Sequence, residues 1–82
     1  MKPFELVSAR MLLAKNLRCL REHSGLSVTE FAQRTGMSAK RLGKIEKGGI
    51  DAHLDDLDRF AQALGIGIAA LFAGNGSDAS GR

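Results

Sequence analysis

The sequence SVTEFAQRTGMSAKRLGKIEK, which runs from Ser27 to Lys47, contains two short helical patterns separated by a glycine. Ser27 stands three residues before Glu30, which is the spacing of a capping box, where each side chain accepts a hydrogen bond from the other residue's backbone N–H. Gly36 follows the first pattern and can adopt the left-handed conformation in which many helices end. Ser38 comes two residues later and is a second candidate N-cap. We therefore expect two helices joined by a tight turn.

Both predicted helices are amphipathic. The inward-facing residues of the first helix recur three and four positions apart, and they are Val28, Phe31, Ala32 and Thr35. In the second helix, Leu42 and Ile45 are three positions apart and point to the same side. The rest of its circumference is basic, with Lys40, Arg41, Lys44 and Lys47. The second helix therefore has an apolar face and a cationic face.

On both sides of this stretch, the segments NLRCLREHSGLS and HLDDLDRFAQALGIGIAALF continue the helical pattern. The positions that carry a family likeness inside the motif are Ala32, Gly36, Leu42, Ile45, Glu46, Lys47 and Gly48. Over residues 9–72 the chain resembles the Cro and phage-repressor family (xenobiotic-response-element type) of helix-turn-helix DNA-binding domains. The resemblance implies an all-α fold: a compact five-helix bundle of the phage-repressor DNA-binding type that contains the helix-turn-helix.

The N-terminal part of the chain fits this order of helices. The inward stripe of the first helix consists of Leu13, Leu17 and Leu20. Gly25 ends that helix, and two starts are compatible with the sequence: Pro3 at the first helical position, or Ser8 as an N-cap. We expect residues 1–8 to be an N-terminal extension and residues 73–82, which are mostly small and polar, to be a disordered tail.

The C-terminal part predicts a fourth and a fifth helix. The inward-facing residues of the fourth helix are expected to be Leu54, Leu57, Phe60, Ala61 and Leu64. Gly65 ends this helix. Gly67 is a tolerable N-cap for a short fifth helix from Ile68 to Phe72.

Charge is unevenly distributed along the 82 residues, whose net charge is +3. Residues 36–49 hold four basic side chains against Glu46 alone. The next segment is acidic, with Asp51, Asp55, Asp56 and Asp58. Two of these aspartates fall in the first turn of the fourth helix, where they complement the helix dipole, and we expect the group to form a solvated face. A basic element beside an acidic one would orient the protein on a polyanion.

No set of residues favours catalysis or metal binding. Cys19 has no second cysteine, and His23 and His53 lie too far apart for a zinc-site spacing. The aspartates lack the glycine-punctuated loop of a calcium site. The predicted helices bring together no nucleophile and base. We therefore expect no enzymatic activity, no cofactor and no metal, and the lack of a signal peptide or long apolar run favours a cytoplasmic, nucleoid-associated location.

The resemblance implies a sequence-specific transcriptional regulator that binds double-stranded DNA in the major groove, and we expect a repressor. By position, the family's DNA contacts fall on Ser27, Val28, Ser38, Ala39, Lys40, Arg41, Lys44 and Lys47. Lys40 and Lys44 would donate to guanine O6 or N7, while Arg41 and Lys47 would grip phosphates.

Two of these positions depart from the family pattern. Val28 stands where many members have a glutamine that touches a phosphate, and Ala39 stands where a long polar base-reading side chain is common. Both departures favour an alternative in which the domain is a protein-binding adaptor that has lost DNA binding. A second alternative is the antitoxin of a toxin–antitoxin pair that autoregulates its operon. The basic second helix of the motif argues against the adaptor.

The resemblance also implies a mostly buried ion pair between Arg21 and Glu46, with two unrelated surface charges as the alternative. The expected assembly is a homodimer that reads an inverted repeat. Its interface is expected at the apolar residues Ile66, Ile68, Leu71 and Phe72, because one short helix cannot bury them all against its own domain. The competing interface is the N-terminal apolar group around Phe4 and Val7.

Overall fold

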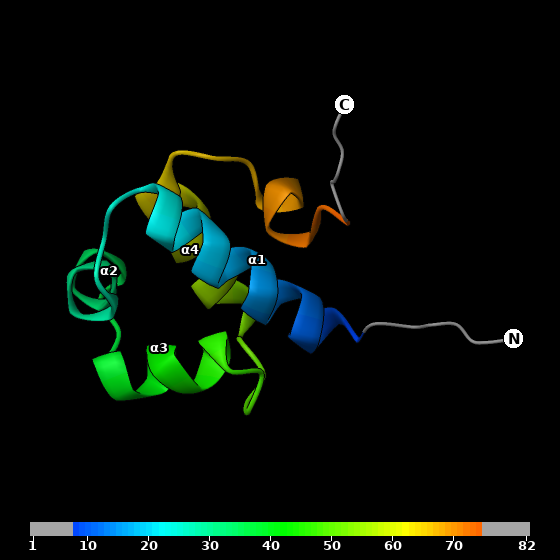
Figure 1. Cartoon of the computed structure of the whole chain (residues 1–82), viewed down its shortest axis with the longest axis horizontal. Helices are drawn as coiled ribbons and strands as arrows, with labels where there is room; N and C mark the ends of the chain where they lie inside the picture. The colour runs from blue at the N-terminus through cyan, green and yellow to red at the C-terminus, as the bar shows by residue number, and fades with distance from the viewer. Residues whose placement is uncertain (1–7, 75–82) are drawn as a thin grey trace, which may run out of the picture.

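The computed structural model describes residues 8–74 as four α-helices and a final 3-10 helix (Figure 1). The elements are α1 (Ala9–His23), α2 (Val28–Thr35), α3 (Ala39–Glu46), α4 (Leu54–Leu64) and η1 (Ile68–Phe72). The predicted all-α class is confirmed, but the prediction of five α-helices is wrong. Within the short η1 segment the backbone closes i to i+3 hydrogen bonds, such as the one from the Ala70 N–H to the Gly67 carbonyl at 3.0 Å, because five residues are too few to propagate α-helical bonds.

The first helix begins at Ala9 because Ser8 caps it. The Ser8 backbone is extended, and its Oγ accepts a hydrogen bond from the Met11 N–H at 3.2 Å. Of the two starts that the sequence allowed, the described residues therefore show the later one. The alternative start at Pro3, the apolar group around Phe4 and Val7, and residues 75–82 of the expected tail lie outside the described residues.

The turn between α2 and α3 forms as the local sequence predicts. The Glu30 N–H donates to Ser27 Oγ at 3.0 Å and the Ser27 N–H donates to Glu30 Oε1 at 2.8 Å, which completes the capping box of α2. Gly36 ends α2 with φ at +75°, a left-handed conformation that costs other residues about 1–2 kcal/mol. Ser38 Oγ then accepts from the Arg41 N–H at 3.0 Å and starts α3. These contacts fix α3 across the end of α2.

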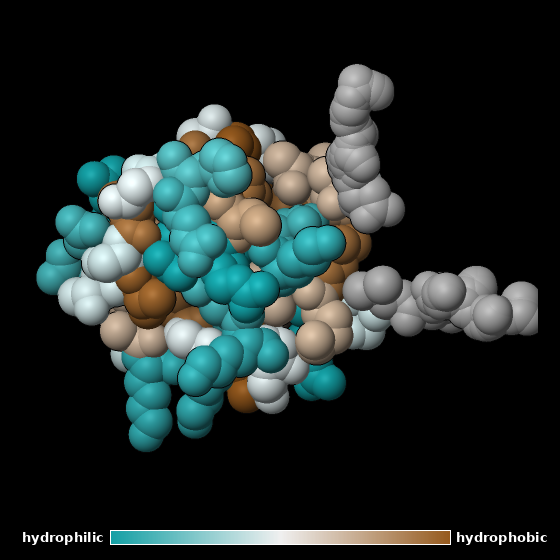
Figure 2. All heavy atoms as spheres, in the orientation of Figure 1, coloured by the Kyte–Doolittle hydropathy of each residue, from teal (hydrophilic) through white to brown (hydrophobic). Residues whose placement is uncertain are grey.

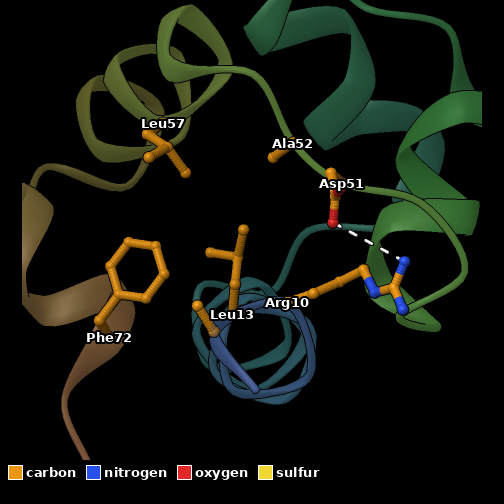
Figure 3. Close-up of a pocket in the computed structure, with 7 residues that line it drawn as sticks. Arg10, Leu13, Asp51, Ala52, Leu57 and Phe72 are labelled. Atoms are coloured by element: carbon orange, nitrogen blue, oxygen red, sulfur yellow. Dashed lines mark ion pairs between the residues drawn. The ribbon is translucent and has the colours of Figure 1, made fainter.

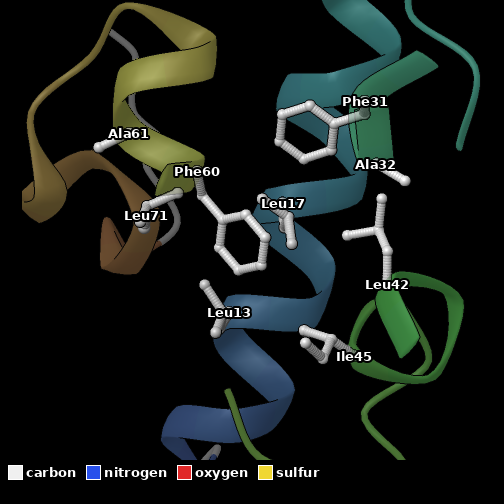
Figure 4. Close-up of a cluster of buried hydrophobic side chains, with 9 residues drawn as sticks. All are labelled: Leu13, Leu17, Phe31, Ala32, Leu42, Ile45, Phe60, Ala61 and Leu71. Carbon is white, nitrogen blue, oxygen red and sulfur yellow. The ribbon is translucent and has the colours of Figure 1, made fainter. Parts of the chain in front are cut away.

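The core lies between α1 and the other four elements. Its buried apolar side chains are Leu13, Leu17, Phe31, Ala32, Leu42, Ile45, Phe60, Ala61 and Leu71 (Figure 4). The rings of Phe31 on α2 and Phe60 on α4 stack with their centroids 5.8 Å apart. Leu42 and Ile45 reach inward from α3, so one face of this helix is committed to the core and the opposite face is left at the surface.

Two residues of the C-terminal part lie where the sequence did not predict them. Leu54 was expected to face inward, but 81% of its surface is exposed. At about 100° per residue it lies about 70° away from the centre of the face that Phe60 and Ala61 bury, and it is the first residue of α4. Leu71 was expected at a dimer interface, but it has no exposed surface because η1 packs against both α1 and α4. Leu71 is therefore a core residue.

Within residues 8–74, none of the helices combines the length and the apolar character that crossing a membrane requires.

Candidate nucleic-acid interface

The exposed face of α3 is cationic. At about 100° per residue, Lys40, Lys44 and Lys47 all fall within about 50° of the direction opposite to Leu42 and Ile45. All three lysine side chains are exposed. Figure 2 shows long hydrophilic side chains that project from the edge of the molecule where α3 lies in Figure 1. A row of ammonium groups on a rigid helix at the edge of the domain is suited to a polyanion.

The N-terminal end of α3 exposes small groups beside the row of lysines. Ser38 and Ala39 are both exposed at the start of the helix. The Ser38 hydroxyl accepts the Arg41 N–H, so it is oriented by the cap and keeps its own proton for a partner. Together with the three lysines, Ser38 and Ala39 define the surface that we call the α3 face.

The N-terminal end of α2 offers fewer groups to a phosphate than the sequence suggested. Val28 is half-buried against the core. The Ser27 N–H is occupied by the Glu30 carboxylate at 2.8 Å, and this hydrogen bond is the main reason that the pKa of Glu30 is lowered. A negative charge already stands at the positive end of the α2 dipole.

The C-terminal end of α3 is tied to α1 by a buried ion pair. Arg21 Nε lies 2.7 Å from Glu46 Oε2, and Arg21 Nη2 lies 3.1 Å from Glu46 Oε1, so the guanidinium and the carboxylate meet in a bidentate arrangement. Arg21 Nη1 also donates to the Leu26 carbonyl at 2.8 Å. The side chains are 11% and 5% exposed, and the hydrogen bond to Glu46 raises the pKa of Arg21. The pair joins α1, the loop before α2 and the end of α3.

The N-terminal end of α3 is tied to α4 by a second ion pair, which the sequence did not predict. Arg41 Nη2 lies 2.7 Å from Asp56 Oδ2, and the same oxygen accepts the His53 N–H at 2.7 Å. Asp56 was expected on a solvated face, but its side chain is only 5% exposed, while that of Arg41 is 28% exposed. The hydrogen bond from Arg41, followed by that from the His53 N–H, lowers the pKa of Asp56.

The second pair changes the position of Arg41 relative to the other cations. At about 100° per residue, Arg41 points about 90° away from the centre of the lysine row. Its guanidinium turns toward α4, and the hydrogen bond to Asp56 raises the pKa of Arg41. One signal in the sequence points to Asp56, because the side chain of an acidic residue three positions after an N-cap often accepts a hydrogen bond from the backbone N–H of the N-cap residue. Nothing local could have identified Arg41 as its partner.

The expected dimer residues form a less uniform surface than the α3 face. Ile68 is 43% exposed, and Ile66 and Phe72 are half-buried. Beside Phe72 lies a pocket of about 260 Å³, with Leu13 and Leu57 on its apolar side (Figure 3). The opposite side carries Arg10 and Asp51, whose charged groups approach to 3.7 Å. The rest of its lining is Ala9 and Ala52.

Comparisons with known proteins agree with this architecture. A family described as a helix-turn-helix domain matches residues 12–71. The restriction-modification controller protein C.AhdI from Aeromonas hydrophila is 31% identical with a TM-score of 0.73, over 76% of this chain and 94% of that one. The hypothetical transcription factor NHTF from Neisseria is 28% identical with a TM-score of 0.76, over 88% and 84% of the two chains. The clp gene regulator ClgR from C. glutamicum is 26% identical with a TM-score of 0.75, over 80% and 86%.

A search among curated proteins found no match. The family match covers most of the chain, and the solved structures agree in fold across the same region. The chain therefore belongs to the helix-turn-helix domain family, and it is a DNA-binding transcription regulator of the Cro/CI type.

Proposed function

We propose that this protein is a repressor that binds an inverted-repeat operator as a homodimer, with the α3 face in the major groove. The observation that carries the proposal is the α3 face itself, where the exposed lysines stand opposite the buried Leu42 and Ile45. A helix of this kind fits the major groove, which is about 12 Å wide and presents guanine O6 and N7 as acceptors. The relatives described as a controller protein and a gene regulator support a role in transcription control.

The residues of the α3 face have different proposed roles. Lys40 lies in the first turn of α3, which enters the groove first, and Lys44 lies one turn further along the same face. Both donate to bases. Lys47 is the C-cap of α3 and contacts a phosphate. The exposed Ser27 hydroxyl, which accepts the Glu30 N–H and keeps its own proton, approaches the DNA backbone from the start of α2. Ala39 is small enough to approach the methyl group of a thymine. Phosphate contacts supply most of the affinity and base contacts supply the sequence preference.

The proposed homodimer uses the surface around η1. Two α3 faces related by a two-fold axis would meet successive major grooves about 34 Å apart. Ile66, Ile68 and Phe72 are available to a second chain, whereas Leu71 is not. Ile68→Glu should therefore dissociate the dimer in sedimentation, while Leu54→Glu, at an exposed leucine of another element, should leave it intact. If both variants remain dimeric, the interface lies elsewhere.

A salt titration tests DNA binding directly. The full chain is mixed with random-sequence duplex, and the binding constant is measured by gel shift across a series of salt concentrations. The proposal predicts that the logarithm of the binding constant falls linearly with the logarithm of the salt concentration, because each neutralised phosphate releases counterions. An adaptor that has lost DNA binding would show no salt-dependent complex, and this result would overturn the proposal.

The antitoxin alternative concerns a partner rather than the DNA site. It retains the α3 face and its salt-dependent binding, and it adds a toxin that covers another surface. The lining of the pocket between Leu13, Leu57 and Phe72 includes none of the three lysines, so a toxin could cover it while α3 is bound to DNA. The α3 face supports DNA binding whether or not a toxin is present, so the proposed repressor does not depend on a toxin.

A further inference from the structure

The first turn of α3 carries two neighbouring cations with different environments. The Lys40 side chain is exposed on the α3 face. The next residue, Arg41, turns aside and places Nη2 at 2.7 Å from Asp56 Oδ2 on α4. Both residues belong to the end of the helix that is proposed to enter the groove first. The contact to Asp56 therefore acts where a small rotation of the helix would displace base-reading side chains most.

Asp56 is fixed by more than its contact to Arg41. Its Oδ2 also accepts the His53 N–H at 2.7 Å, which holds the carboxylate at the start of α4. Its side chain is almost fully buried, and an ionised carboxylate at such a place must keep its partners. The backbone at the start of α4 thus sets the position of Asp56. The contact between Asp56 and Arg41 then holds the first turn of α3 relative to α4. The 28% exposure of the Arg41 side chain leaves it close enough to the surface to exchange Asp56 for a phosphate.

We propose that Asp56 is a specificity-determining residue that does not touch DNA: through Arg41 it fixes the first turn of α3 against α4, and it withholds one cation from indiscriminate phosphate binding. This inference rests on the proposed DNA binding of α3. It also changes the role that the sequence suggested for Arg41, which becomes a positioning residue instead of a phosphate contact. The pair then favours the correct sequence by holding the base-reading side chains in place. It also keeps Arg41 from adding to the phosphate affinity that all sequences share.

The decisive quantity is the ratio of two affinities. One is measured on a duplex that the parent protein selects from a random pool, and the other on random-sequence duplex, both across a salt series. A variant that is merely less stable loses affinity for both duplexes alike, so its ratio does not change. A variant with a misplaced helix loses affinity mainly for the selected duplex.

Asp56→Asn removes the charge that holds Arg41. We expect the ratio to fall about 5-fold to 10-fold, which corresponds to one weakened base contact. On random duplex the salt slope should grow by about one, because the released Arg41 neutralises a further phosphate. Asp55→Asn is the matched control, since it removes the same charge from the same turn of α4 at an exposed side chain. It should keep both the parent ratio and the parent slope.

Arg41→Ala separates positioning from phosphate contact, and it leaves the hydrogen bond between Asp56 and the His53 N–H in place. We expect a lower ratio with an unchanged salt slope, and the Asp56→Asn, Arg41→Ala double variant should lose the extra slope. A smaller slope with an unchanged ratio would show that Arg41 grips a phosphate and would overturn the inference. The same holds if Asp56→Asn behaves like Asp55→Asn. If Asp56→Asn does not fold, Arg41→Ala alone decides. A parent protein that binds neither duplex would overturn the proposed function as well.

Discussion

The two ends of α3 are held by different kinds of ion pair. At the C-terminal end, Arg21 and Glu46 meet in a bidentate arrangement with both side chains nearly buried. At the N-terminal end, a single nitrogen of Arg41 meets Asp56, and the arginine is partly exposed. Breaking the first pair leaves a buried charge without a partner, whereas breaking the second releases a cation that can reach water.

The difference means that α3 is held more firmly at its C-terminal end than at its N-terminal end. The buried pair fastens α3 to α1 and to the Leu26 carbonyl, so it mainly supports the fold. The partly exposed pair holds the end that we propose to enter the groove, and we expect it to cost less to rearrange. We therefore expect the C-terminal pair to dominate the free energy of unfolding and the N-terminal pair to dominate the preference between DNA sequences.

The largest expected effect is on stability at the C-terminal pair. Glu46→Gln should lower the free energy of unfolding by about 3–5 kcal/mol, because the guanidinium of Arg21 is left buried without its hydrogen-bonded carboxylate. Urea denaturation of the purified chain measures the change. Against a total of about 5–15 kcal/mol for a typical domain, such a loss is large.

Glu22→Gln is the control for this measurement. The Glu22 carboxylate approaches the same guanidinium at 3.9 Å but from the surface, with 62% of its side chain exposed. Its removal should change the free energy of unfolding by less than about 1 kcal/mol. If Glu46→Gln cost no more than this control, the two ends of α3 would not differ in the way that we describe.

A smaller effect on the free energy of unfolding is expected when acid protonates Asp56 in the N-terminal pair. The hydrogen bond from Arg41 lowers the pKa of Asp56 in the folded protein, so the folded state binds fewer protons than the unfolded chain. The stabilisation is complete above the ordinary aspartate pKa of about 3.9 and is lost as the pH falls through the lowered value. The free energy of unfolding should therefore decrease with falling pH below about pH 4, and less steeply in Asp56→Asn.

Glu30 adds a pH dependence of the same sign, because its pKa is lowered by the Ser27 N–H and hydroxyl. Asp56→Asn should accordingly keep part of the slope. Unfolding curves recorded between pH 2 and pH 6 would show the difference. Identical slopes in the parent and in Asp56→Asn would mean that Asp56 is not held by Arg41 in solution.

Local sequence patterns were sufficient for much of the fold. The capping box of Ser27 and Glu30, the left-handed Gly36 and the cap at Ser38 each depend on a few neighbouring residues, so their spacing predicts their geometry. The expectation for Arg21 and Glu46 came from a family resemblance, since residues 25 positions apart carry no local signal. The structure places these two side chains in contact.

Features that depend on packing between helices were not predictable in this way. The Arg41 and Asp56 contact requires the angle between α3 and α4, which periodicity does not give. Leu54 matched the helical spacing but lies on the edge of the buried face, and Leu71 looked available for a second chain but fills the core. A helical period describes one helix, whereas burial depends on where its neighbours lie.

The central claim is that Lys40 and Lys44 on the α3 face read bases, whereas Lys47 at the C-cap of α3 contacts a phosphate. The most direct test compares the Lys40→Ala, Lys44→Ala double variant with Lys47→Ala on selected and random-sequence duplexes across a salt series. The double variant should lose about 1–3 kcal/mol of discrimination for each base contact removed. Lys47→Ala should weaken both duplexes alike and reduce the salt slope by about one. If the two variants changed the affinity ratio and the salt slope to the same extent, the division of the lysines into base-reading and phosphate-binding residues would be contradicted.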